Sequence, residues 1–200
     1  MEWAVDFSAT VSAADVEHMR DSLEAKLKAE SGQHEEAARI LWELLVQVRH
    51  SKRPRWECIT MVHLGKVYKS LRWRTAQQLL EEAQDLAVRI GFDKGRMLAL
   101  AELGRLESDW GHFDQALALY AKALPLVEPG ELERRRALLL AQVTAHEGLN
   151  QLDRCRELMA EVLHLDDELD HTESGADRAR LQRIRTALTH RHTTGDRRQQ

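Results

Sequence analysis

A small side chain recurs along this chain at an almost constant interval, and this regularity constrains the fold more than any other feature. The recurring positions are Ala37, Ala76, Ala116 and Cys155, which are separated by 39, 40 and 39 residues. Self-similarity at a fixed period of this size is typical of arrays in which one supersecondary unit stacks on the next. The spacing therefore predicts a stack of repeated units.

The composition indicates that each unit is helical. Hydrophobic residues make up 43% of the chain and charged residues 31%, so the chain can bury a core and keep a solvated surface. Leu, Ala, Glu, Gln and Arg dominate, whereas Val and Ile are sparse and there are only 3 Pro. These residues favour helices and leave little from which to build strands.

Short breaks divide the chain into nine predicted helices. Ser12 followed by Asp15 is typical of an N-terminal capping box, and Pro54 suits the first turn of a helix. Gly91 stands where a left-handed C-terminal cap would end a helix, and Pro129-Gly130 is a strong stop. The predicted helices cover about 13–30, 34–49, 55–70, 73–90, 93–109, 113–127, 131–147, 151–168 and 174–190.

The stretch from Ala99 to Leu124 shows how two such helices would pack as a pair. Two backbones approach closely only where a side chain is missing, and Gly104 supplies that gap. Tyr120 of the second helix would fill the space, and Gly111 would permit the tight turn between them. The other predicted contact residues of this pair are Leu103, Phe113, Ala116 and Ala123.

This pattern resembles the tetratricopeptide repeat (TPR), whose signature is W-x2-L-G-x2-Y, then A-x3-F, then A. The third repeat matches at Leu103-Gly104, Gly111, Ala116, Tyr120 and Ala123, and the second at Leu64-Gly65, Tyr68, Ala76, Leu80 and Ala83. The first repeat keeps Gly32, Ala37 and Leu41, and the fourth keeps Leu140-Ala141, Cys155 and Met159. Departures are Leu100 or Ala101 near the Trp position, Glu107 at the Tyr position, and Arg72 in place of a turn glycine. The period exceeds the usual repeat of about 34 residues, as in kinesin-light-chain-like variants and in the repeat domains of some bacterial regulators.

The resemblance implies an all-α, right-handed α-solenoid of about four TPR-like hairpins with a C-terminal capping helix. We expect an N-terminal arm over residues 1–11, in which Trp3, Val5 and Phe7 could pack against the first helix. The repeat array would cover 12–170, the capping helix 171–191 and a disordered tail 192–200.

The resemblance also implies where a partner would bind, because the first helices of such repeats line a concave groove. The groove positions implied for the second and third repeats are Ile59, Val62, His63, Lys66, Lys69, Leu98, Ala101, Glu102, Arg105 and Ser108. Apolar residues with Lys66, Lys69 and Arg105 suit a protein or peptide that has apolar anchors and some acidic residues. The asparagines that clamp chaperone C-termini are absent, so a chaperone tail is not predicted.

We therefore expect a noncatalytic protein- or peptide-binding scaffold, acting as an adaptor or a regulatory sensor. No nucleophile, P-loop or dinucleotide motif is present, so no enzyme and no cofactor are predicted. Asp167 and His171 are four residues apart, but a metal site needs three or four converging ligands, so no metal is predicted. The basic residues and the histidines could instead have no binding role, as ordinary side chains that are exposed to solvent or buried.

Two alternatives belong to other classes. The chain could be a self-associating subunit, especially if Trp56, Trp73 or Trp110 is exposed. It could also bind nucleic acid through Lys52, Arg53 and Arg55 or through Arg134-Arg135-Arg136, although the net charge of -4 argues against this. The N-terminus resembles no signal or transit peptide, and no apolar run approaches the length of a membrane span. With Cys58 and Cys155 expected to be reduced and buried, the prediction is a cytoplasmic protein without membrane contact.

Overall fold

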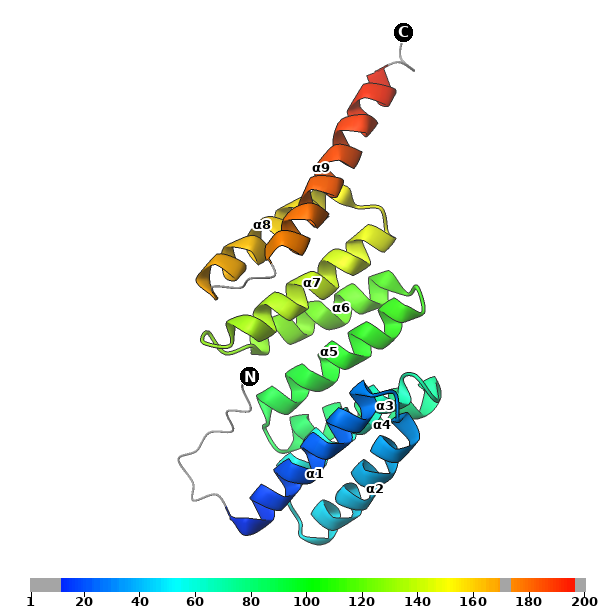
Figure 1. The fold of residues 1–200 in the computed structure, drawn as a ribbon, viewed down its shortest axis with the longest axis vertical. Helices are drawn as coiled ribbons and strands as arrows, with labels where there is room; N and C mark the ends of the chain where they lie inside the picture. The colour runs from blue at the N-terminus through cyan, green and yellow to red at the C-terminus, as the bar shows by residue number, and fades with distance from the viewer. Residues whose placement is uncertain (1–11, 170–173, 197–200) are drawn as a thin grey trace. The chain divides into compact units, whose positions relative to one another are not determined.

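The computed structural model describes residues 12–169 and 174–196, and this part of the chain is all-α. Within the described residues it contains nine α-helices and one 3-10 turn, with no strand (Figure 1). The helices are α1 (Ala13–Glu30), α2 (His34–His50), α3 (Pro54–Tyr68), α4 (Trp73–Arg89), α5 (Asp93–Asp109), α6 (Phe113–Ala123), α7 (Leu132–Gly148), α8 (Leu152–Glu168) and α9 (Ser174–Asp196). The predicted all-α fold class is therefore confirmed, and the helix order follows the sequence prediction.

The predicted helix boundaries hold at most ends. The Ser12 side chain caps α1, and Asp15 completes the capping box through the Ser12 backbone. Pro54 occupies the first turn of α3. In five inter-helix turns of the described residues, one residue has a left-handed backbone conformation, which allows the chain to reverse direction. These residues are Gly32, Lys52, Gly91, Gly111 and Asn150.

Three boundaries differ from the prediction. Helix α3 ends at Tyr68 because the Tyr68 carbonyl accepts from the amides of Leu71 and Arg72, which turns the chain early. Helix α6 ends at Ala123, and Leu124–Leu126 form a 3-10 turn around Pro125, which cannot donate a helical hydrogen bond. Helix α9 continues to Asp196, past the predicted end at about 190, so the first part of the tail that was expected to be disordered, residues 192–196, is helical.

The chain divides into two compact units, residues 1–95 and 96–200, with the division inside α5. In the first unit α1 packs on α2, α2 on α3, and α3 on α4. The apolar stripes of these helices are buried between them. Buried members include Leu41, Leu45, Cys58, Met61, Leu64, Ala76, Leu80 and Ala83.

In the second unit α6 packs on α7, α7 on α8, and α8 on α9. Its two apolar clusters share no buried residue, although the partly buried Leu124 packs against both. One joins α5, α6 and α7 around Met97, Ala116, Tyr120 and Leu138. The other joins α7, α8 and α9 around Val143, Met159, Val162 and Ile184. The expected capping helix thus covers an apolar face that α7 and α8 would otherwise expose.

Two helical glycines allow the close approach that the sequence predicts. A Cβ atom on Gly65 would lie 2.6 Å from Cγ of Leu80, and one on Gly104 would overlap the ring of Tyr120. Real Cβ atoms do not approach other atoms so closely, so a side chain at either position would push the paired helix away. The Leu-Gly pair therefore sets the helix-to-helix distance within both hairpins.

Candidate partner-binding surface

The groove residues of the second repeat lie on α3, or in the case of Lys69 at its C-terminal cap, in the first unit. Positions 59, 63 and 66 are spaced by four and three residues, so they share one face of the helix. Ile59, His63 and Lys69 are half-buried and Lys66 is exposed. Val62 is only 4% exposed and belongs to the core, so its side chain is not available to a partner in this structure.

His63 contributes a neutral imidazole to this face at physiological pH. Burial lowers the pKa of His63 to about 4, and the positive charges of Lys66, His18 and Lys26 lower it further. The face therefore carries lysine charges beside an uncharged, partly covered ring. Such a surface can attract an anion and still offer apolar contact.

The groove residues of the third repeat lie on α5, in the second unit. Leu98, Arg105 and Ser108 are half-buried, whereas Ala101 is 5% exposed and Glu102 is 7% exposed. The Arg105 guanidinium forms an ion pair with the Glu102 carboxylate one turn earlier. This pairing neutralises most of the charge that was expected to steer an acidic partner from α5. The positive character of the predicted site therefore rests on α3.

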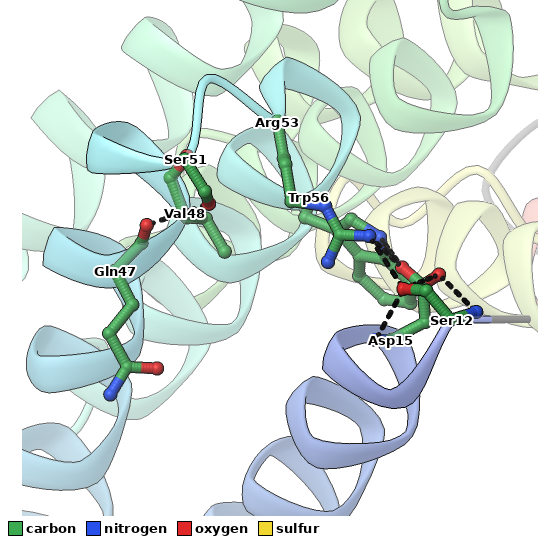
Figure 2. Close-up of polar contacts among 7 residues, drawn as sticks. All are labelled: Ser12, Asp15, Gln47, Val48, Ser51, Arg53 and Trp56. Carbon is green, nitrogen blue, oxygen red and sulfur yellow. Dashed lines mark hydrogen bonds and ion pairs between the residues drawn. The ribbon is translucent and has the colours of Figure 1, made fainter.

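The basic stretch at the start of α3 is used inside the first unit, as Figure 2 shows. Arg53 forms an ion pair with Asp15 at 2.7 Å and donates to the Ser12 hydroxyl at 3.1 Å. The Trp56 indole N–H donates to the same carboxylate at 2.8 Å. These donors lower the pKa of Asp15, with the Ser12 hydroxyl contributing most. The cluster fastens α3 to the capped end of α1.

The second basic run, at the start of α7, is also engaged by acidic side chains. Arg134 pairs with Glu131 at 2.9 Å and Arg135 with Glu161 at 2.5 Å. Arg136 is mostly buried and bridges two carboxylates, Asp166 of α8 and Asp177 of α9 at 2.6 Å. These contacts explain why three arginines can stand at a helix N-terminus, where the dipole disfavours them. Acidic side chains thus engage Arg53 of the first basic run and all three arginines of the second.

Sequence reasoning missed several contacts between distant residues. The Trp42 indole N–H donates to the Tyr68 hydroxyl at 2.9 Å, which joins α2 to the end of α3. His18 is 3% exposed and its ring centroid lies 4.2 Å from that of Trp56. The buried residues of α1 are His18, Ser22 and Ala25, so no apolar stripe in the sequence marked the face that His18 occupies. Nothing local in the sequence indicates the partner of Trp42.

The remaining candidate chemistry can be placed briefly. Cys58 and Cys155 are both buried free thiols, as predicted, and burial raises the pKa of Cys58 to about 12 and of Cys155 to about 11. No group of three metal-ligating side chains occurs in the described part of the chain. His171, one of the two residues considered for a cation, lies outside the described residues. Among the helices described, none is both long and apolar enough to cross a bilayer.

Comparison with known proteins supports the fold. No protein-family model and no curated protein sequence matches this chain. A solved structure of putative kinesin light chain TPR-like repeats from Podospora anserina is similar at a TM-score of 0.69 with 18% identity, over 89% of this chain and 90% of that one. BtubC (BKLC) from P. vanneervenii is similar at a TM-score of 0.68 with 18% identity, over 88% and 82%. The chain therefore has the fold of TPR-like helical repeat proteins.

Proposed function

We propose that this chain is a noncatalytic scaffold of the cytoplasm that binds a protein or peptide through its first-helix surface. The observation that carries the proposal is the face of α3, where Ile59, His63, Lys66 and Lys69 stand together with solvent-accessible surface. Helical repeat proteins commonly use such extended faces for recognition, because stacking leaves one side of each first helix uncovered.

The chemistry of α3 favours a partner with apolar anchors and nearby acidic residues. Ile59 and the neutral ring of His63 offer apolar contact, and the ammonium group of the exposed Lys66 would attract carboxylates. In the second unit, taken by itself, the half-buried Leu98 and Ser108 of α5 are the proposed contact residues. Arg105 is paired with Glu102 and would add little net charge.

The test is capture of partners from a lysate of the source organism, with mass spectrometry as the readout. The double variant Lys66→Glu/Lys69→Glu should lose at least tenfold of the specific partner relative to the unmodified protein. The matched control, Arg89→Glu/Lys122→Glu, reverses the same number of charges at exposed positions on α4 and α6 and should retain the partner. Equal retention by both variants would place the binding surface away from α3.

The same experiment separates the alternatives. Recovery of this protein alone would favour self-association. Recovery of nucleic acid that is lost on raising the salt concentration would favour nucleic-acid binding. The engagement of Arg53 and of Arg134 to Arg136 by acidic side chains argues against the latter.

A further inference from the structure

Helix α1 carries an apolar stripe that no described residue covers. Val16, Leu23 and Leu27 are 54%, 46% and 58% exposed. Their spacings of seven and four residues place them on one face of the helix. Isolated exposed apolar residues need no explanation, but three aligned along one helix form a surface that water solvates poorly.

The repeat geometry shows what this stripe is suited to contact. The equivalent positions forty residues further on are Trp56, His63 and Val67 of α3. The Trp56 ring packs on His18 of α1, and its indole N–H donates a hydrogen bond to Asp15. His63 lies near enough to His18 and Lys26 for their charges to lower the pKa of His63. This face of a first helix is therefore the one directed at the first helix before it. On α1 the same face is exposed among the described residues.

The stripe is small for an interface between separate molecules. Stable protein–protein interfaces use about 20–30 residues on each side, whereas this stripe offers three large apolar side chains. A segment of the same chain escapes most of the entropy loss of association, since its attachment keeps its local concentration high. The size of the surface therefore favours a short tethered segment.

We propose that residues 3–7 of this chain dock on the α1 stripe as an extended strap. Residues 1–11 lie outside the described part of the chain, but their sequence and their attachment point at Ser12 are known. Trp3, Val5 and Phe7 alternate with Ala4 and Asp6, so an extended segment would direct all three apolar side chains to one side.

The distances along the two segments agree. Leu23 and Leu27 follow Ser12 by 11 and 15 residues, which is about 16 and 22 Å along a helix that rises about 1.5 Å per residue. Phe7 and Val5 precede Ser12 by 5 and 7 residues, which is about 16 and 23 Å along an extended chain at about 3.3 Å per residue. A strap that runs back along α1 thus brings Phe7 level with Leu23 and Val5 level with Leu27.

Disulfide trapping in the full chain tests the register. The variant Val5→Cys/Leu27→Cys should form an intramolecular disulfide, mapped by peptide mass under non-reducing conditions, because docked residues come within disulfide reach. The matched control Ala4→Cys/Leu27→Cys differs by one position, and its thiol would point away from the helix. We expect at least a tenfold faster crosslink in the first variant. The native thiols are fully buried and should not interfere.

Three outcomes would overturn the strap. Equal crosslinking in both variants would mean that the segment has no fixed register, and no crosslinking in the first would mean that it does not dock. Disulfides between two chains at micromolar concentration would assign the stripe to a second copy. As a further check, adding Leu23→Glu to the first variant should slow the crosslink severalfold, because it charges the surface that Phe7 would contact.

Discussion

Acid should destabilise the first unit through His18, whose ring is buried in neutral form. The imidazole is 3% exposed, stacks on Trp56, and has Nε2 3.5 Å from the Thr60 hydroxyl, while Nδ1 is buried without a hydrogen-bond partner among the described residues. Burial, assisted by the positive charge of Arg53, lowers the pKa of His18 from 6.5 to about 4, against the opposing effect of Asp15 and Asp21. A proton on this ring would be poorly solvated in the folded state.

The size and sign of the effect follow from linkage. The unfolded chain binds a proton on this histidine below pH 6.5, whereas the folded chain binds it only near pH 4, so stability falls as the pH falls between these values. The full loss is about 3 kcal/mol below pH 4, and about 2 kcal/mol of it should be lost between pH 7.5 and pH 5. Above pH 7 the contribution is constant.

Urea unfolding followed by circular dichroism at pH 7.5 and 5.0 measures this loss. The variant His18→Phe keeps an aromatic ring beside Trp56 and removes the titrating group. Between pH 7.5 and 5.0, the free energy of unfolding of this variant should fall by about 2 kcal/mol less than that of the unmodified protein. His63 titrates in both proteins, and because burial is the main cause of its lowered pKa, only the smaller effect of the His18 charge on it differs between them. An identical pH dependence in the two proteins would refute the assignment to His18.

Two further predictions concern packing and buried charge in the second unit. Gly104→Ala should reduce the free energy of unfolding by about 1–3 kcal/mol, because the added methyl group overlaps the ring of Tyr120. The control Gly130→Ala adds its methyl group in open space and should change stability by less than about 0.5 kcal/mol. Equal effects of the two variants in thermal unfolding would contradict the role of Gly104 in the close approach of the two helices. Arg136→Met should destabilise by about 3–5 kcal/mol because it leaves Asp166 and Asp177 buried without their cation, and Asp166→Asn with Asp177→Asn should recover part of that loss in urea unfolding. Failure of the amide pair to recover any stability would argue against the buried charges as the cause.

Local signals were sufficient to predict the helices. Caps, prolines and turn glycines act within four residues, so Ser12, Pro54 and Gly111 mark helix ends whatever the tertiary structure. Pro125 is the exception: the apolar pattern continues past it to residue 127, but the α-helix ends at Ala123 and a 3-10 turn follows. The fixed spacing of small residues predicted the stacking, and the overlap at Gly104 gives its physical basis.

The candidate surface was harder to predict, because exposure depends on contacts that sequence spacing does not encode. Val62 and Ala101 occupy groove positions of the repeat pattern and yet are buried. Arg105 was expected to steer a partner, but Glu102 pairs with it. Ion-pair partners of Arg136 lie 30 and 41 residues away, beyond the reach of local charge patterns. The surface as a whole stays a prediction.

The weak motif of the first repeat has a physical reason in this structure. A repeat signature records contacts to both neighbours, and the contacts of α1 with other described helices are to α2 and α3, which follow it. Its inner face is specialised for α3, through Asp15, His18 and the fully buried Ala25. Its outer face carries Val16 and Leu27, which match no repeat position but suit an apolar cover. A strap formed by residues 3–7 would explain why that face remains apolar at the end of an array, where a capping surface is usually polar.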